Sequence, residues 1–119
     1  MANPNIVNVS SITGKTDVFE LTTTNANLVT ATANTVFKIN SILISNIDGA
    51  NAANVTVNYY DGSNSRAIAN IISIPAQATL QVIDKNSSFY LEETDIVQAF
   101  AGANSDLECL VSYDVIADA

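Results

Sequence analysis

Three acidic side chains stand close together late in the sequence, at Glu92, Glu93 and Asp95. Retaining and inverting glycosidases use two carboxyl groups, held across a cleft, as their catalytic residues. A turn, in contrast, places all three on one edge of a domain, and we expect it to spread them into solvent. There they would keep the adjoining strand edge from pairing with another chain. We interpret the segment as an acidic turn without catalytic residues.

The chain contains no histidine and a single cysteine, Cys109. Ser-His and Cys-His nucleophile systems are therefore excluded. One cysteine without histidine supplies neither an internal disulfide nor a typical four-ligand zinc site. Cys109 shares its phase with Val111 and Tyr113, so we expect a buried and chemically inert core residue. The sequence thus predicts no enzyme, no metal site and no cofactor.

Two further segments could bind a ligand. Asp61-Gly62-Ser63-Asn64, together with Asp48, could offer oxygen ligands to calcium, but the spacing is not that of a dedicated calcium loop, and a plain turn is the favoured interpretation. Tyr60 lies in the opposite phase to Tyr59, so its ring is expected outside the core, where it could stack on a sugar. One aromatic ring makes a poor platform, and cross-strand packing is its commoner use.

Composition narrows the function classes. The 119 residues carry 4 basic and 12 acidic side chains, a net charge of −8, which repels phosphate backbones and disfavours nucleic-acid binding. No apolar run approaches the roughly 18 residues of a membrane helix. The opening MANPNIVNV shows no secretory signal. We expect one domain without nucleic-acid or membrane partners.

The stretch Thr35–Asp61 is the centre of the predicted fold. Val55, Val57 and Tyr59 alternate with polar residues, as in a strand with one buried face. Upstream, Phe37 and Ile39 hold one phase and Ile42 and Ile44 the other, which predicts a β-bulge near residues 40–41. Asn, Asp and Gly residues at positions 46–51 indicate a turn. We therefore predict a long antiparallel hairpin at the centre of one sheet.

Short alternating runs separated by turn signals occupy the rest of the chain. A turn is predicted at Thr13-Gly14-Lys15, and the expected strands cover residues 18–22, 28–32, 66–74, 78–84, 89–91, 97–101 and 107–115. This pattern predicts an all-β fold, a single antiparallel β-sandwich of the Ig-like or jelly-roll type. We assign residues 14–119 to the sandwich domain and residues 1–13 to an N-terminal arm or edge strand.

The N-terminal segment offers a possible partner contact. Its short apolar run contains Ile6, Val7 and Val9 and follows Pro4, which cannot donate a backbone hydrogen bond. Such a strand presents unpaired backbone groups to a neighbouring chain. We predict that this arm docks onto a neighbouring subunit or capsid protein. The alternative is an edge strand of the domain's own sheet.

Several segments, taken in order, carry a resemblance that spans nearly the whole chain. They are MANPNIVNV, Gly14-Lys15-Thr16, VFKINSILISN, Asp48-Gly49, NVTVNYYDG, ISIPAQATLQVIDK, FYLEETD and VSYDVI. Together they resemble a family of small Ig-like virion structural proteins from tailed phages, especially marine cyanophages and pelagiphages. One departure is Thr94, where such proteins often carry Gly before Asp95. The resemblance implies a particle component without enzymatic activity.

We therefore expect a non-enzymatic virion protein, made in the host cytoplasm, that decorates or cements the capsid. A tail or neck component is the alternative, as is a carbohydrate-binding sandwich for host attachment that uses Tyr60. The expected partners are other virion proteins, namely the major capsid protein or tail and neck proteins, and further copies of the chain in a homo-oligomer.

Overall fold

Nine β-strands make up the computed structural model, which describes residues 4–117. The strands are β1 (Ser11–Glu20), β2 (Ala26–Thr30), β3 (Thr35–Asn46), β4 (Ala53–Tyr60), β5 (Ser65–Ile74), β6 (Thr79–Ile83), β7 (Phe89–Leu91), β8 (Ile96–Ala101) and β9 (Leu107–Ala117). No helix occurs among the described residues, so none there could span a membrane.

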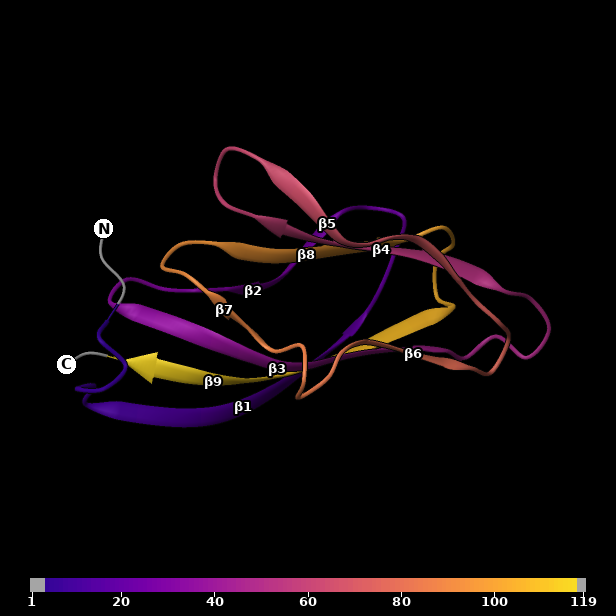
Figure 1. The fold of residues 1–119 in the computed structure, drawn as a ribbon. Coiled ribbons are helices and arrows are strands. Elements are labelled where there is room, and N and C mark those ends of the chain that lie inside the picture. The colour runs from indigo at the N-terminus through magenta and orange to yellow at the C-terminus, as the bar shows by residue number, and fades with distance from the viewer. Residues whose placement is uncertain (1–3, 118–119) are drawn as a thin grey trace.

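The strands form two antiparallel sheets that pack face to face. Sheet A has the order β1-β9-β3-β6, with β7 also paired to β3, and sheet B has the order β2-β8-β4-β5. Figure 1 shows sheet A as the lower layer and sheet B as the upper one, with the start of β1 and the end of β9 at the same end of the sandwich. The predicted all-β antiparallel sandwich is confirmed.

The predicted bulge in β3 is confirmed. The pairing of β3 with β9 shifts register between Ile39 and Ser41, which leaves Asn40 as the extra residue. This single insertion returns Ile42 and Ile44 to the face that Ile39 occupies, and all three side chains are fully buried. The 12-residue strand therefore keeps one apolar face against sheet B along its whole length.

The predicted central hairpin is wrong in its pairing. β3 belongs to sheet A and β4 to sheet B, so the segment between them crosses from one layer to the other. The buried Asn46 amide holds this crossing by donating to the carbonyl oxygens of Asn51 (3.0 Å) and Ile74 (2.9 Å). Alternation of apolar and polar residues identifies a strand with one buried face. It is compatible with two strands paired in one sheet and equally with two strands that face each other across the core, as β3 and β4 do.

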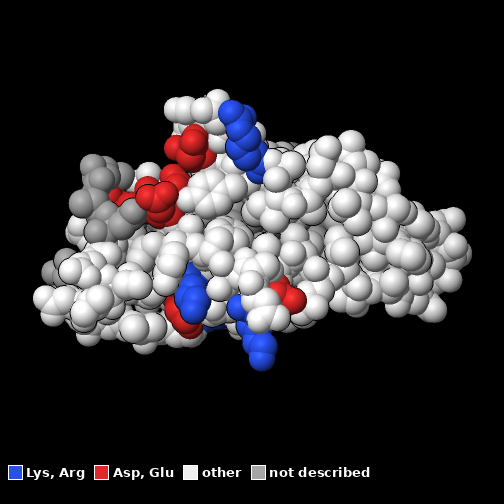
Figure 2. All heavy atoms as spheres, viewed as in Figure 1, with Lys and Arg blue, Asp and Glu red and all other residues white. Residues whose placement is uncertain are grey.

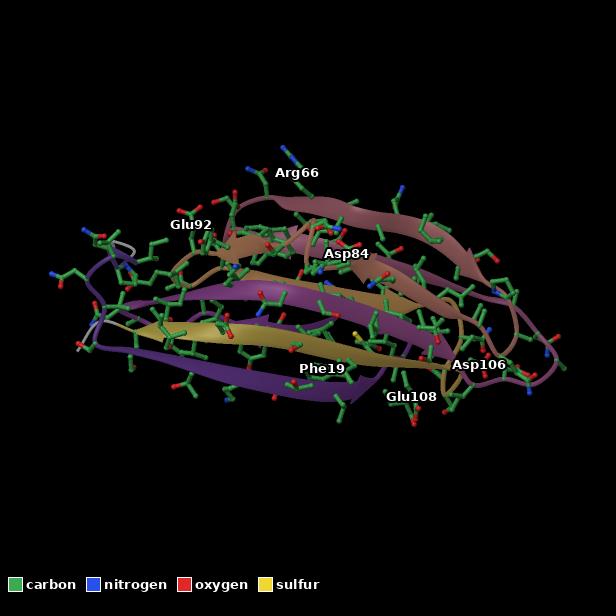
Figure 3. The ribbon with its side chains drawn as sticks, turned by 60° about the horizontal axis from the view of Figure 1, so that its bottom comes forward. Phe19, Arg66, Asp84, Glu92, Asp106 and Glu108 are labelled. Carbon is green, nitrogen blue, oxygen red and sulfur yellow. The ribbon has the colours of Figure 1, made fainter. Side chains whose placement is uncertain are left out.

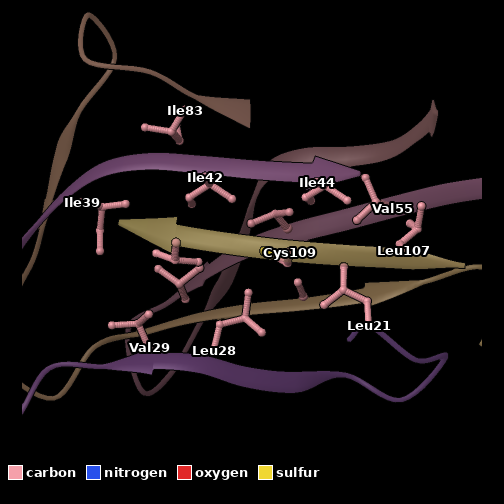
Figure 4. Close-up of a cluster of buried hydrophobic side chains, with 14 of the residues drawn as sticks. Leu21, Leu28, Val29, Ile39, Ile42, Ile44, Val55, Ile83, Leu107 and Cys109 are labelled. Carbon is pink, nitrogen blue, oxygen red and sulfur yellow. The ribbon is translucent and has the colours of Figure 1, made fainter. Parts of the chain in front are cut away.

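The core fills the space between the layers. Ile39, Ile42 and Ile44 of β3 meet residues from β2, β4, β8 and β9, and Figure 4 shows Val55 and Cys109 among them. Cys109 is buried as expected. Volume changes at these positions act directly on stability, because side chains in such interiors are close-packed.

β1 differs most from its prediction. The expected turn at Thr13, Gly14 and Lys15 is wrong, because all three residues lie inside β1 and pair regularly with β9. The strand ends at Glu20, and the buried Leu21 follows with its backbone N–H donated to the Leu107 carbonyl (2.9 Å). Glycine is disfavoured in strands on average, but an extended ladder to a long neighbour overrides that preference.

Candidate interaction surfaces

The acidic turn between β7 and β8 is held against the sandwich, contrary to the expectation that its carboxylates spread into solvent. Glu93 and Asp95 are both buried. The Glu93 carboxylate accepts a hydrogen bond from the Asn34 backbone N–H. The Asp95 carboxylate accepts one from the Tyr59 hydroxyl at 2.5 Å. These carboxylates face different elements, and each ties the turn to a neighbouring part of the sandwich.

Tyr59 anchors this end of the molecule. Its ring packs against Phe89 with centroids 5.9 Å apart, and its hydroxyl also accepts a hydrogen bond from the Glu92 backbone N–H (3.3 Å). Burial, followed by the hydrogen bond to Asp95, raises the pKa of the Tyr59 hydroxyl above its usual range. The hydroxyl therefore stays protonated and serves as a fixed donor between β4 and the acidic turn.

The thiol of Cys109 and the side chains that could bind a metal ion do not come together in one site within the described residues. Burial raises the pKa of the Cys109 thiol to about 12, which keeps it protonated and unreactive at neutral pH. Over residues 4–117, no group of three or more His, Cys, Asp or Glu side chains could hold a metal ion.

The two segments considered for calcium are turns. Asp61 Oδ1 accepts the backbone N–H groups of Ser63 (2.9 Å) and Asn64 (2.7 Å). Asp48 Oδ1 accepts those of Ala50 (2.8 Å) and Asn51 (3.3 Å). These backbone hydrogen bonds lower the pKa of both carboxyl groups. Each carboxylate thus closes its own loop, as an Asx turn does.

Tyr60 makes a hydrogen bond within its own turn. The side chain is half-buried at the end of β4, and its hydroxyl donates to the Gly62 carbonyl at 3.1 Å. The hydroxyl of the residue predicted for a glycan contact is therefore engaged in a hydrogen bond within its own turn.

The N-terminal segment, residues 4–10, lies across one end of sheet A (Figure 1). Ile6 and Val7 sit in a turn closed by the Asn8 N–H bond to the Asn5 carbonyl (3.0 Å), and they form no strand. Val7 is 91% exposed and Ile6 46%, while Val9 is half-buried. The predicted contact residues are therefore brought together on one short segment, two of them open to solvent.

This segment covers part of the outer face of sheet A. Val36 and Ile116 are directly opposed on that face, outside the core cluster, yet they are only 3% and 5% exposed. Pro4 and Ile6 of this segment line a hollow of about 380 Å³ together with Val36, Tyr90 and Glu92. The segment is thus an ordered strap with an outward apolar side.

A second surface was not predicted. On the outer face of sheet A, Val18, Leu43 and Leu110 line a hollow of about 530 Å³, with Glu20 and Glu108 at its end. Figure 3 labels Glu108 on β9, which pairs with Glu20 of β1. The signal in the sequence was the apolar residue in the polar phase of two strands, Leu43 in β3 and Leu110 in β9, which breaks the alternation that a solvated face would show.

Charged residues are distributed unevenly. On the face seen in Figure 2, the Lys, Arg, Asp and Glu side chains lie towards the left and in the middle of the molecule, and the region towards the right end is uncharged. The charged region includes the acidic turn and the end of β5 at Arg66 (Figure 3). Depletion of charge over a broad area is a feature of surfaces that contact other proteins.

Known structures with this fold come from unrelated sources. One chain, from the acid-stable capsid of Helicobacter pylori bacteriophage KHP30, matches with a TM-score of 0.56 and 10% identity, covering 93% of this chain and 91% of that one. A second, from the disulfide-linked pili of Bacillus endospore appendages, matches with a TM-score of 0.55 and 13% identity over 92% and 88%. These likenesses establish a shared β-sandwich fold.

A third structure, the Drosophila NLP core, matches with a TM-score of 0.46 and 18% identity, covering 88% of this chain and 98% of that one. No family model matches the sequence, and no curated protein is similar enough to count as a relative.

Proposed function

We propose that this chain is a non-enzymatic structural protein of a tailed-phage virion that decorates or cements the capsid. The ordered strap at residues 4–10 carries the proposal, because its Val7 side chain is 91% exposed, more than any other large hydrophobic side chain in the described residues. The sequence resemblance to virion proteins and the fold shared with a phage capsid chain both support it. A role in an assembly also accords with the origin of the pilus chain.

The arrangement of polar groups supports a structural role. The carboxylates of Glu93 and Asp95 and the hydroxyl of Tyr59 are engaged in holding the turns of the sandwich. The strap supplies a short apolar contact that loses little conformational freedom on binding, because it is already folded.

The test uses purified particles of the phage that encodes the chain. Mass spectrometry of intact particles should detect the protein at a copy number matching a symmetric site, and cryo-EM should show it on the capsid. Particles assembled without the protein should rebind the added wild-type chain. A Val7→Ser variant should rebind more weakly while keeping its thermal stability, since the Val7 side chain is almost fully exposed.

Absence of the protein from purified particles would overturn the proposal. Density on the tail or neck would move the protein to the alternative location. Equal rebinding by the wild type and Val7→Ser would show that the strap is not the contact.

A further inference from the structure

The free edge of β1 is unlike the free edges of β2, β5 and β6 in the described sandwich. β2 and β6 have five residues each and carry register shifts, as does β5, where Ile71 adopts a positive φ of 51°. Short strands and bulges of this kind prevent edge-to-edge association. β1, in contrast, runs for ten residues without a register shift, and β9 is its only neighbour among the described strands.

The hydrogen-bonding pattern of β1 fixes which groups face outward. The Leu21 N–H bonds to Leu107, its antiparallel partner, so odd-numbered residues of β1 direct their backbone groups to β9. The N–H and C=O groups of the even-numbered residues therefore point to the free edge. These residues are Ile12, Gly14, Thr16, Val18 and Glu20.

We propose that β1 pairs antiparallel with β1 of a second copy of this chain, about a twofold axis through Thr16, so that sheet A continues across the dimer. A continuous sheet requires that paired residues lie on the same face. In this register Thr16 opposes the second copy's Thr16 and Gly14 opposes its Val18. All of the even-numbered outward groups then find partners.

Charge complementarity selects this register. Lys15 opposes Asp17 of the second copy, and Asp17 opposes its Lys15, so the twofold axis creates two opposite-charge pairs. These are non-hydrogen-bonded pairs, in which Cα atoms approach to about 4.5 Å and side chains interact most closely. Sliding the strands by one same-face step places Lys15 against Lys15 in one direction and Asp17 against Asp17 in the other.

Lys15 and Asp17 also limit which strands can pair with the free edge of β1. Lys15 and Asp17 lie on the core side of β1, and charged residues on the inner side of an edge strand reject most incoming strands. A second copy in the stated register is a partner that neutralises both. The β1 edge therefore pairs selectively with a second copy of itself. Its length and regularity alone would allow it to pair with many other strands.

Gly14 supplies an independent observation. Its φ is not positive, and a Cβ built there would meet only Asp114 Oδ1, at 3.6 Å, an ordinary contact. Glycine inside a strand lowers its stability and often marks the close approach of another chain. In the proposed dimer the side chain of Val18, 72% exposed in the single chain, lies across from Gly14 of the second copy.

The inference does not depend on the proposed virion role, because it is tested on the purified full-length chain. Sedimentation velocity over a series of concentrations should show a monomer–dimer equilibrium. Lys15→Glu and Asp17→Lys should each raise the dissociation constant by about tenfold or more, because each places two like-charge pairs at the interface. Lys85→Glu, the same charge change in an exposed loop, should leave the equilibrium unchanged.

An equimolar mixture of the two variants gives the decisive measurement. The glutamate introduced at position 15 of the first variant would face the lysine introduced at position 17 of the second. Asp17 of the first would face Lys15 of the second, so the mixture should dimerise again. Thr16→Pro should also abolish the dimer, because proline removes an outward N–H while leaving the ladder to β9 intact. Circular dichroism checks that each variant is folded, since Asp17→Lys loses the hydrogen bond from Tyr113.

Three results would overturn the inference. They are a wild-type chain that stays monomeric at every concentration, a dissociation constant that Lys15→Glu leaves unchanged or a dimer that persists in Thr16→Pro, and a mixture of folded charge variants that dimerises no more tightly than either variant alone. Loss of virion incorporation with an intact dimer, or the reverse, separates this inference from the proposed function.

Discussion

The hydroxyl of Tyr113 donates a hydrogen bond of 2.6 Å to the carboxylate of Asp17, and this bond links the buried face of β9 to the edge strand β1. The Tyr113 ring stacks on Phe37 of β3, with centroids 5.2 Å apart and planes 19° from parallel. One side chain thus connects three strands of sheet A. Because its ring is buried and its hydroxyl faces a carboxylate, the phenol is held in its neutral form.

Stability should fall at alkaline pH. Burial, and then the bond to Asp17, raises the pKa of Tyr113 from its usual 10 to about 12, and burial raises that of Cys109 from 9 to about 12. In the unfolded chain these groups ionise near their usual pKa values, whereas the folded chain keeps them protonated. Their stabilisation is therefore complete below pH 9 and is lost as the pH rises towards 12.

Urea unfolding at a series of pH values checks this. The free energy of unfolding should decline with pH above about 9, and Tyr113→Phe should decline less steeply because one titrating group is gone. Identical slopes for the wild type and Tyr113→Phe would contradict the assignment of part of this effect to Tyr113.

Thr94→Gly should stabilise the protein. Thr94 lies in the acidic turn with φ of 68°, a left-handed conformation that is unfavourable for a β-branched residue, and its side chain is exposed. The backbone N–H still bonds to Ala31 at 2.9 Å, so glycine keeps the turn and removes the strain. We expect a gain of about 1 kcal/mol in the free energy of unfolding.

Thr94→Ala is the matched control, because alanine removes the branched side chain but is still disfavoured at positive φ. Chemical denaturation of the three proteins measures the differences. A glycine variant no more stable than the alanine variant would show that the conformation at Thr94 is not strained.

Much of the fold follows from local patterns. The bulge in β3 was predictable because Phe37 and Ile39 are out of phase with Ile42 and Ile44, and only an inserted residue puts all four on one face. The strands that pair with β3 and β4 could not be predicted in this way, because alternation records burial and carries no information about the neighbouring strand. The strand across Gly14 was missed for a related reason, since a long-range ladder to β9 overrides a local turn signal.

The surfaces were only partly predictable. Apolar residues at Ile6, Val7 and Val9 indicated a contact segment, but the hollow that Ile6 shares with Val36 and Tyr90 depends on segments far apart in the sequence lying together in space. Asp95 and Glu93 were expected to face solvent because a turn usually does. Their actual partners, Tyr59 and Asn34, are more than thirty residues away, beyond the reach of a local pattern.

Cys109→Asp should destabilise the sandwich severely. The Cys109 side chain packs among the apolar residues of both sheets, and a carboxylate there would be buried without a partner. We expect a loss of about 4 kcal/mol or more, enough to abolish the native state in a domain of ordinary stability. Cys109→Ala, which only removes the sulfur, should cost far less. Slow labelling of the wild-type thiol by a thiol reagent, with a rate set by unfolding, would confirm that the residue is inaccessible.

Tyr60→Ala distinguishes the structural role from sugar binding. Because the Tyr60 hydroxyl bonds to Gly62 in its own turn, we expect the wild type and the variant alike to give no reproducible signal on a glycan array. The variant should lose a small amount of stability, about 1 kcal/mol, from the missing hydrogen bond and ring packing. Reproducible binding by the wild type that the variant lacks would favour the carbohydrate-binding alternative.

Deleting residues 2–9 should weaken the sandwich without unfolding it. We expect the deletion to uncover Val36 and Ile116, which are buried on the outer face although they lie outside the core, while Ser10 keeps its N–H bond to the Ala117 carbonyl (3.0 Å). Re-exposing these side chains should cost about 1 to 3 kcal/mol. Thermal unfolding should remain cooperative at a lower midpoint, because the core between the sheets is untouched.

Val7→Ser is the matched control for this deletion, because Val7 is 91% exposed and its replacement should change stability by less than about 0.5 kcal/mol. If the deletion variant is unfolded, the strap belongs to the folding unit and the sandwich does not fold without it. If the deletion leaves stability unchanged, the burial of Val36 and Ile116 owes nothing to the strap. A moderate loss in the deletion variant with no loss in Val7→Ser is the result that assigns the inward side of the strap to stability and leaves its outward side for a partner.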